Sequence, residues 1–436
     1  MPMENCDDCQ RCLPCPVTTS DPSEGAYPIA KDKGNIWYCT SCFYCEDVCP
    51  HGSPREYAID RRRSEQPTNE QNMGQLQKIR EQGHIFPFEE ENNELRSLWG
   101  LPPLIHPDQQ ELQRLFDAII DNNQSFKSKT RKVTKKQAKA TTKQKTAKKS
   151  GQQMALFLGC IIPYRIPEYE LSARQLLQKL GIEYVDPPFS CCGSIMTESH
   201  SEELWLVIGG YNLALAEAAG IKTIISLCGG CTGNLRRVNQ TLQKESEKRE
   251  KVNERLKLIG KEYHGTTEVI HFSEFLHQKI ERKELLTKIL PERKKLLNHL
   301  TISVQVPCQV IRPKNSSPNA DLKEQLLTDS LALTTINIQS FPYETLCCGS
   351  TLLLYNQSLA YKIAKKRLEI LDKRAVDALI LGCGNCSMNY KIHQKEYSNT
   401  NLATFFFTEI LSFAMGFPNQ KLEHLIHQKN ILSRKN

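Results

Sequence analysis

The sequence predicts a multidomain protein of mixed α+β and α/β structure, with a small helical, cysteine-rich domain followed by two homologous α/β domains. Three observations predict this fold class. The eighteen cysteines of the 436-residue chain fall into four ordered groups with none left over. A lysine-rich segment separates the first two groups from the last two. Beyond it, strand-like and helical segments alternate in two runs that carry the same motifs in the same order, which indicates two related halves.

The lysine-rich segment divides the chain. We expect domains over residues 1–126, 154–299 and 300–436, with a flexible linker over 127–153. Within the linker, Lys127–Lys149 holds eleven Lys and Arg and no acidic residue; subtracting these eleven from the net charge of +8 leaves −3 for the rest. The segment contains few large apolar residues, so it cannot bury enough surface to become ordered. A solvated linker is the first interpretation, and a basic tether for acidic lipid, an acidic partner or nucleic acid is the second.

The internal repeat is carried by three pairs of motifs. ALFLGC, which ends at Cys160, corresponds to TISVQVPC, which ends at Cys308. SCCGS corresponds to LCCGS, and IKTIISLCGGCTGN corresponds to VDALILGCGNCSMN, which end at Asn234 and Asn389. In each case the cysteines follow a predicted strand, which is the usual place for a site in an α/β unit. We therefore expect two homologous halves that face each other, each building one metal site.

The N-terminal region contains two runs of four closely spaced cysteines, followed by a predicted helix in the segment HPDQQELQRLFDAIIDNN. CTSCFYCEDVCP matches the bacterial ferredoxin pattern, and CDDCQRCLPCP supplies a second run. The pattern predicts crossed ligation, with Cys6, Cys9, Cys12 and Cys49 on one cluster and Cys39, Cys42, Cys45 and Cys15 on the other. The last gap of the first run is two residues instead of three, so the role of Cys15 stays open. Structural zinc sites are the alternative, and disulfides are a weaker one in a reducing cytoplasm.

The C-terminal region carries five cysteines in each half. The first set is Cys160, Cys191, Cys192, Cys228 and Cys231, and the second set is Cys308, Cys347, Cys348, Cys383 and Cys386. Five thiolates exceed what a tetrahedral zinc ion or a plain cubane requires. Gly193 and Gly349 follow the adjacent cysteines and suit a backbone that passes very close to a metal.

These residues resemble a known family. The ten cysteines, with LCGGCTGNLRRVNQTL, CQVIRP and CGNCSMNYKIHQ around them, are similar to two copies of the cysteine-rich CCG domain found in the B-type subunit of heterodisulfide reductase. The N-terminal region resembles the C-type subunit of the same enzyme, a helical two-cluster ferredoxin-like domain. The fused order is that of the D-type subunit of heterodisulfide reductase, and the iron–sulfur subunit of glycolate oxidase shares it.

The resemblance implies a complete set of cofactors and a mechanism. The eight N-terminal cysteines would hold two [4Fe-4S] cubanes, and each five-cysteine set would hold a noncubane [4Fe-4S] cluster and form the catalytic site. The cubanes would relay electrons to the noncubane clusters, which would cleave a disulfide. Family members often have histidine where Gln309 stands, and an amide cannot serve as the acid. Arg312 either pairs with an anionic substrate group or packs beside Pro313, and His200 and His393 are interpreted as ordinary histidines.

Two functions follow, and each needs a partner. The first is an oxidoreductase, related to methanogenesis, that reduces the coenzyme M–coenzyme B heterodisulfide or a similar small disulfide to thiols. The alternative is an iron–sulfur electron-transfer subunit of a flavin-dependent 2-hydroxy-acid (glycolate or lactate) dehydrogenase. A nucleic-acid-binding protein is disfavoured because the basic charge is confined to the linker. The chain lacks a nucleotide-binding glycine motif, so we expect a membrane cytochrome b or a flavoprotein as the redox partner.

The location is predicted from the absence of two signals. The longest apolar stretch, Leu402–Phe417, contains Glu409 and is shorter than the roughly 20 residues of a membrane span. The N-terminus has no apolar core of a signal peptide. We therefore expect a cytoplasmic protein without a membrane span of its own, which could bind the cytoplasmic face of a membrane through its partner.

Overall fold

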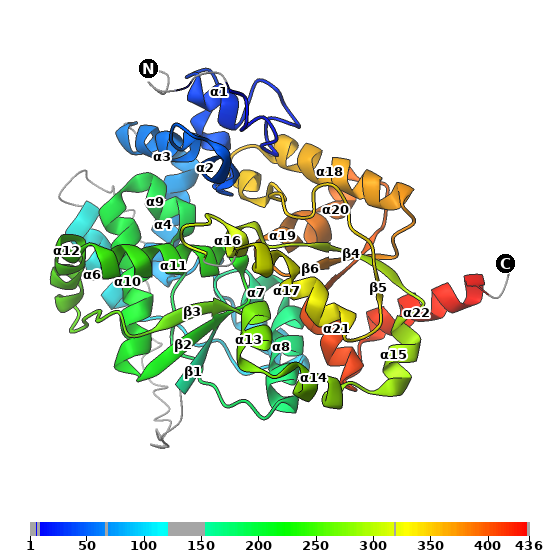
Figure 1. Cartoon of the computed structure of the whole chain (residues 1–436). Helices are drawn as coiled ribbons and strands as arrows, with labels where there is room; N and C mark the ends of the chain where they lie inside the picture. Colours follow the sequence, from blue (N-terminus) through cyan, green and yellow to red (C-terminus); the bar gives the residue numbers. More distant parts are fainter. Residues whose placement is uncertain (1–5, 7–8, 66–68, 121–152, 318–319, 434–436) are drawn as a thin grey trace.

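The computed structural model describes residues 6, 9–65, 69–120, 153–317 and 320–433. The lysine-rich linker predicted over 127–153 lies outside these residues except for its last position. Figure 1 shows the first half in green beside the second half in yellow to red, with the blue N-terminal region above the junction between them. No helix in the described ranges is both long enough and apolar enough to cross a bilayer.

The first half is built on a parallel three-stranded sheet with the order β1-β2-β3. Its strands are β1 (Gln153–Phe157), β2 (Ile221–Ser226) and β3 (Glu268–His271). Its helices are α7 (Ile162–Arg165), α8 (Pro167–Lys179), α9 (Ser194–His200), α10 (Glu202–Ala218), α11 (Gly229–Lys244), α12 (Ser246–Lys257), α13 (Phe272–Lys279), α14 (Arg282–Lys288) and α15 (Pro291–Leu297).

The second half repeats this plan with one more strand, in the parallel order β5-β4-β6-β7. Its strands are β4 (Thr301–Gln305), β5 (Asn337–Ile338), β6 (Ala378–Leu381) and β7 (Ala403–Phe406). Its helices are α16 (Cys308–Ile311), α17 (Ala320–Ala332), the 3-10 helix η2 (Ser350–Leu354), α18 (Gln357–Lys373), α19 (Gly384–Ser387), the π-helix η3 (Met388–Ile392), α20 (Gln394–Tyr397), α21 (Phe407–Ala414) and α22 (Gln420–Ser433). The predicted repeat of two α/β halves is confirmed.

The N-terminal region is helical, as predicted. Its elements are α1 (Ala26–Ala30), η1 (Ile36–Tyr38), α2 (Tyr44–Val48), α3 (Pro54–Ser64), α4 (Glu70–Gln82), α5 (Glu90–Leu98) and α6 (Gln109–Ile120). The Asp108 carboxylate accepts the backbone N–H of Gln110 at 2.9 Å and caps α6. Leu76 on α4 and Phe116 on α6 are fully buried in the same core as the first half. The segment that follows the ferredoxin-like cysteines therefore packs as part of that half.

The two halves share one hydrophobic core. Where α8 packs against α21, the ring of Tyr169 stacks on Phe406 with centroids 3.9 Å apart. Beside it, the hydroxyls of Ser172 and Thr408 lie 2.6 Å apart. Close packing across this junction fixes the position of one half relative to the other.

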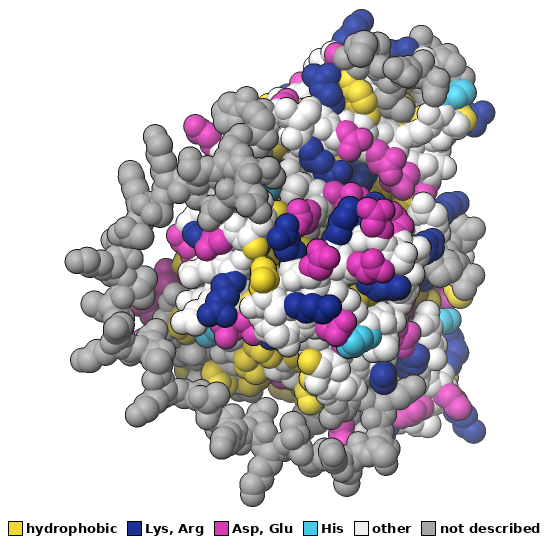
Figure 2. Space-filling view, turned by 90° about the vertical axis from the view of Figure 1, so that its left-hand side faces the viewer, with side chains coloured by type: hydrophobic (Ala, Val, Ile, Leu, Met, Phe, Trp, Pro, Cys, Tyr) yellow, Lys and Arg dark blue, Asp and Glu magenta, His cyan; other side chains and the backbone are white. Residues whose placement is uncertain are grey.

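The surface over α10 and α12 carries charges of both signs. Lys248 pairs with Glu202 at 2.9 Å and Arg255 pairs with Glu203 at 2.7 Å, in both cases joining α12 to α10. Figure 2 shows Lys and Arg side chains interspersed with carboxylates across this face. Opposite charges this close largely cancel, so these cations do not form a basic stripe of the kind that binds nucleic acid.

Candidate metal centres and cavity

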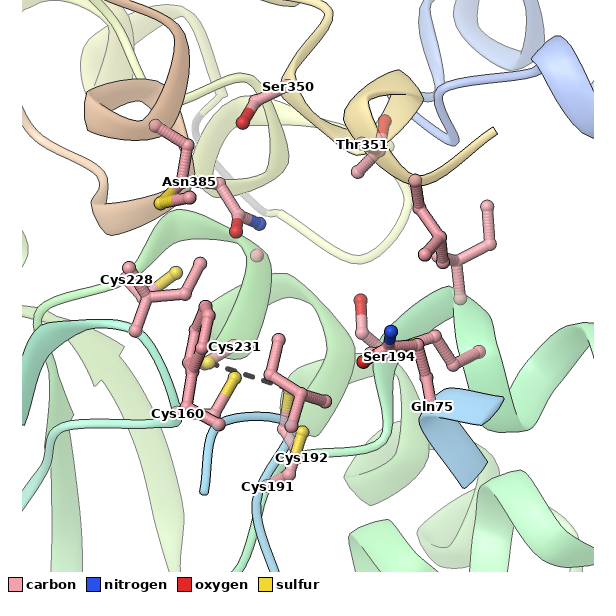
Figure 3. Close-up of a pocket in the computed structure, with 18 of the residues that line it drawn as sticks. Gln75, Cys160, Cys191, Cys192, Ser194, Cys228, Cys231, Ser350, Thr351 and Asn385 are labelled. Carbon is pink, nitrogen blue, oxygen red and sulfur yellow. Dashed lines mark hydrogen bonds between the residues drawn. The ribbon is translucent and has the colours of Figure 1, made fainter. Parts of the chain in front are cut away.

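The first set of cysteines is assembled from three loops. Cys160 follows β1, Cys191 and Cys192 precede α9, and Cys228 and Cys231 lie at the beginning of α11. All five are buried. The Cys192 and Cys231 sulfurs are 3.5 Å apart, and Cys160 is hydrogen-bonded to Cys191. The structure therefore brings the first set together in one place, as Figure 3 shows.

The second set is assembled from the equivalent loops of the second half. Cys308 begins α16, Cys347 and Cys348 precede η2, and Cys383 and Cys386 lie at α19. Hydrogen bonds join Cys308 to Cys347 and Cys348 to Cys386. None of the ten cysteines of the two sets forms a disulfide.

The two sets meet at their Cys-x2-Cys loops. The Cys228 sulfur lies 3.8 Å from the Cys383 sulfur. The Asn385 backbone N–H donates to Cys228, and the Gly230 backbone N–H donates to Cys383. Each half thus donates a backbone hydrogen bond to a cysteine sulfur of the other half, as expected of two related halves that face each other. These contacts place the two sites side by side.

Hydrogen bonds among the thiols decide which sulfurs carry negative charge. Donation by Cys231 and Cys383 holds the pKa of Cys228 well below its usual value. Donation by Cys160, and then by Cys192, does the same for the pKa of Cys191. Thiolates are the form of cysteine that binds metals. In the second set, donation by Cys347 and then by Cys386 holds the pKa of Cys348 well below its usual value. Each set thus contains a sulfur prepared for metal binding, surrounded by thiols that a metal would deprotonate.

In the N-terminal region the thiols are grouped across the two runs. Burial raises the pKa of Cys12 to about 11, with contributions from the charges of Cys49, Cys15 and Cys6. Burial, and then the charge of Cys42, raises the pKa of Cys15 to about 12. The thiols of Cys15, Cys39, Cys42 and Cys45 line one small cavity, and Cys9 is exposed. Cys15 therefore lies with the second run and Cys49 with the first, which is the arrangement that crossed ligation requires.

The N-terminal region contacts the second set directly. Cys42 is hydrogen-bonded to Cys347, and Thr351 donates its hydroxyl to the Thr40 carbonyl at 3.2 Å. The Gln309 amide donates to the Ser41 carbonyl at 2.9 Å. The Gln309 side chain therefore attaches the ferredoxin-like part to the loop that carries Cys308.

The charged candidates from the sequence have partners within the protein. Arg312 lies 3.6 Å from the Asp47 carboxylate and donates to the Thr345 carbonyl. Of the two interpretations of this arginine, the structure therefore favours packing within the protein over binding of a substrate anion. His393 is partly buried and lies 2.6 Å from Glu396, and its interpretation as an ordinary histidine stays a prediction.

A cavity of about 400 Å³ opens onto the first set. Figure 3 shows Cys160, Cys191, Cys192 and Cys231 on one side of it, with Ser350 and Asn385 of the second half opposite. Further lining comes from the N-terminal region through Gln75, Lys78 and Phe86. The second set, in contrast, lines a void of only about 20 Å³. Space for a ligand therefore exists beside the first set, and all three regions of the chain enclose it.

The charged side chains that line the cavity are all positive. Its lining includes the exposed cations Lys78 and Arg165 and contains no carboxylate. Arg165 lies over the ring of Phe86, 4.8 Å from its centroid. Neither cation forms an ion pair with a carboxylate of the described residues. The remaining lining is mostly apolar, which suits a ligand with an apolar body and an anionic end.

Two asparagines hold the adjacent cysteines of the two sets in place through hydrogen bonds. Asn234 donates its amide to the Cys192 carbonyl at 2.7 Å, and Asn389 donates to the Cys348 carbonyl at 2.8 Å. They occupy equivalent places at the end of the repeated motifs, so the repeat itself was the signal that could have identified them. Such bonds fix the conformation of a ligand loop.

Two buried histidines also contact the cysteine loops. His84 is 6% exposed, and burial lowers its pKa to about 4 while the charge of Cys191 opposes this shift. The neighbouring Gly83 carbonyl accepts the Cys191 N–H at 2.7 Å. His271 lies 2.8 Å from the Gly382 carbonyl. Nothing in the sequence connects these residues with the cysteines, because the contacts join distant segments.

Gly193 and Gly349 share a positive φ of 80°. An added Cβ would lie 2.5 Å from the Thr197 hydroxyl at Gly193 and 2.9 Å from Ile363 at Gly349. A left-handed backbone and a close neighbour both require glycine here. The close neighbours that the structure shows at these glycines are side chains, and the predicted approach of the backbone to a metal stays a prediction.

The cysteine groups differ from a site for a single metal ion. Among the described residues, no three His, Cys, Asp or Glu side chains converge on one point at the distances of a single ion. A structural zinc site needs four such ligands. Thiols collected in fours and fives suit a cluster, which is larger than one ion.

Comparison with known proteins gives consistent matches along the chain. A model of the cysteine-rich domain named CCG matches residues 154–236 and 302–391, and a model of the 4Fe-4S dicluster domain matches residues 5–53. The B-type subunit of the ferredoxin:CoB-CoM heterodisulfide reductase of Methanosarcina mazei is 27% identical, over 62% of this chain and 91% of that protein. The membrane anchor subunit of the 8-methylmenaquinol:fumarate reductase of Wolinella succinogenes is 25% identical, over 62% and 95%.

A solved structure shares the fold. A hypothetical protein from Helicobacter pylori superposes with a TM-score of 0.50 at 20% identity, over 62% of this chain and half of that protein. The two curated relatives are subunits of reductases. The chain is thus an iron–sulfur protein in which a ferredoxin-like 4Fe-4S domain precedes two CCG domains, an order that fits a fusion of the C-type and B-type subunits of heterodisulfide reductase.

Proposed function

We propose that the chain is the iron–sulfur catalytic subunit of a disulfide reductase. The observation that carries this proposal is the cavity of about 400 Å³ whose wall contains all five cysteines of the first set. The second set lines a void of only about 20 Å³, and we infer from this difference that the first site has room for a small molecule in addition to a cluster. The overall reaction takes two electrons and two protons and converts one disulfide into two thiols.

The eighteen cysteines would hold four clusters. Two [4Fe-4S] cubanes would be ligated by the crossed N-terminal groups, and each five-cysteine set would ligate a noncubane [4Fe-4S] cluster. The buried, partly ionised thiols of both sets suit iron. When bound, the clusters would supply single electrons and an open position for sulfur. The contact of Cys42 with Cys347 would bring the ferredoxin-like part next to the second set.

The protein itself would position the disulfide and exclude water from it. The apolar lining of the cavity removes solvent around the reacting sulfurs. Asn234 and Asn389 hold the adjacent cysteines in place through their carbonyls. Electrons would come from another redox subunit, and a membrane cytochrome b or a flavoprotein remain the two candidates.

Lys78 and Arg165 should select an anionic substrate. Replacing both by glutamine is expected to raise KM for a disulfide with two terminal carboxylates, such as that of 6-mercaptohexanoate, by roughly 2- to 30-fold, because exposed ion pairs each contribute about 0.2–1 kcal/mol. The kcat should change little, since the interaction exists before the reaction begins. Steady-state kinetics would measure this, with the disulfide of 6-mercaptohexanol as the neutral substrate.

The matched control is Lys257→Gln, an exposed lysine on α12 outside the cavity lining. It should leave KM and kcat unchanged for both the anionic and the neutral disulfide. An equal change in KM for the anionic and the neutral disulfide would contradict the assigned role of the two cations.

The proposal is tested by anaerobic purification followed by a direct assay. We expect about sixteen irons per chain, as four clusters require. Reduced methyl viologen should then be oxidised only when a disulfide is added, without any flavoprotein, and Cys192→Ala should abolish this oxidation. A thiol-dependent EPR signal in the oxidised protein would support binding of substrate sulfur beside the first set.

The second candidate is an electron-transfer subunit, and one observation favours it. A relative of this chain is a subunit of a fumarate reductase, an enzyme whose named substrate is not a disulfide. Full iron loading without disulfide-dependent oxidation would support this alternative and count against the disulfide reductase. The flavin-dependent 2-hydroxy-acid dehydrogenase would then be the first partner to test.

A further inference from the structure

One of the four most buried tyrosines lacks a hydrogen-bond partner for its hydroxyl within the part of the chain that the structure describes. Tyr169, Tyr211, Tyr263 and Tyr390 are each less than 2% exposed. Three of their hydroxyls have partners: Tyr211 with Glu111 at 2.9 Å, Tyr263 with the Asn239 carbonyl at 3.2 Å and Tyr390 with Gln305 at 3.0 Å. The Tyr169 hydroxyl is fully buried and has no partner among the described residues. Buried phenols almost always donate a hydrogen bond, so this exception needs an acceptor.

The position of Tyr169 is fixed by packing. Its ring stacks on Phe406 with an interplanar angle of 5°, at the junction of α8 with α21 where the two halves meet. One turn earlier, the corner between α7 and α8 packs on the cysteine loop of the second half. An added Cβ on Gly384 would lie 3.1 Å from Ile162 and 3.6 Å from Ile166. The ring therefore has little freedom to turn toward another acceptor.

Cysteines of both sets act electrostatically on the Tyr169 hydroxyl. The pKa of Tyr169 is raised well above its usual value by burial and then by the charges of Cys383, Cys228 and Cys386. Two of these cysteines belong to the second set, and the third belongs to the first. Cys228 and Cys383 are the pair whose sulfurs meet at 3.8 Å. The hydroxyl thus lies near the place where the two sites adjoin.

We propose that Tyr169 is a positioning residue that donates its phenolic hydrogen to a sulfur of the cluster held by the second set. This inference rests on the proposed function, because it needs a cluster at that site. The acceptor is either a cysteine thiolate or an inorganic sulfide. A hydrogen bond to such a sulfur stabilises the reduced cluster, which carries one more negative charge, and so raises the reduction potential.

The experiment compares Tyr169→Phe with wild type in the anaerobic, iron-loaded chain. The variant should keep its full iron content, because no ligand is lost. In an EPR-monitored redox titration, one cluster should show a more negative midpoint potential, and the others should be unchanged. Hyperfine spectroscopy after exchange into D₂O should show loss of one exchangeable proton close to that cluster.

The matched control is Tyr263→Phe, which removes an equally buried hydroxyl that bonds to Asn239. It should leave every potential and the exchangeable-proton signal unaltered. Unchanged potentials and proton signal in Tyr169→Phe, with full iron, would overturn the inference and leave a buried water as the acceptor. Wild-type chain without iron would instead overturn the proposed function, and with it the basis of this inference.

Discussion

Replacing Cys15 by alanine should lower the iron content of the chain by one to four of the expected total of about sixteen irons. Cys15 is 8% exposed and lies in the cavity formed with Cys39, Cys42 and Cys45. Alanine offers no ligand, so the three remaining thiolates would hold an incompletely ligated cluster. Iron and sulfide analysis of the anaerobically purified variant measures the loss, and EPR of the reduced protein identifies the affected cluster.

Double variants test the crossed arrangement itself. If Cys15 shares a cluster with Cys39, then Cys15→Ala combined with Cys39→Ala should damage one cubane only. Cys15→Ala combined with Cys6→Ala should damage both. Uncrossed ligation predicts the reverse, with Cys15 and Cys6 on one cluster. A Cys15→Ala chain with full iron content and an unaltered EPR spectrum would show that the shortened spacing has removed Cys15 from ligation.

Most of the fold could be predicted because the repeat and the strand-like runs are local signals. β2, β4 and β6 lie within the expected segments, and β1 overlaps the segment ALFLGC but begins two residues before it. The strands β3, β5 and β7 were not predicted. β3 has only four residues, and β7 is fused to α21 inside the apolar stretch Leu402–Phe417. A short strand next to a helix shows no period of its own.

The cysteines could be found from spacing alone, but their surroundings could not. Lys78 and Phe86 reach the cavity from a segment that the sequence shows only as polar helix and loop. Gln309 was compared with a catalytic histidine, yet its amide bonds to Ser41 in the N-terminal region. These contacts join residues far apart in the chain and depend on how three regions pack. Composition and periodicity report local structure, so they carry no information on such contacts.

The attachment of the N-terminal region depends on a buried ionic cluster at Glu198. This carboxylate is 3% exposed and accepts hydrogen bonds from Arg237 at 2.7 and 3.0 Å and from Arg55. The two guanidinium groups lie 4.2 and 4.6 Å from the centroid of the Phe43 ring. Glu198→Gln would leave two buried cations without their counter-charge. Removing one partner of a buried ion pair costs about 3–5 kcal/mol.

We therefore expect Glu198→Gln to lower the melting temperature at pH 7 by several degrees and to expose the N-terminal region to limited proteolysis. Asp60→Asn is the matched control, because Asp60 forms a 3.4 Å pair with Arg63 at the surface and is 74% exposed. Surface ion pairs of this kind contribute little to stability, so Asp60→Asn should have the same melting temperature as wild type. A variant as stable and as protease-resistant as the control would show that the carboxylate charge is not needed at this junction.

The pH dependence of the difference in melting temperature between wild type and Glu198→Gln supplies a second test. Burial alone would raise the pKa of Glu198, but the charges of Arg237 and Arg55 outweigh this effect and hold it well below the ordinary value of 4.5. A carboxyl whose pKa is lower in the folded state stabilises the protein above its unfolded pKa, and this contribution is lost as the pH falls toward the folded value. The gap in melting temperature between wild type and Glu198→Gln should thus be constant from pH 7 to about pH 5.5 and narrow below about pH 4.5. Glutamine does not titrate, so a gap that stays constant throughout would mean that the charge of Glu198 is not what stabilises the junction.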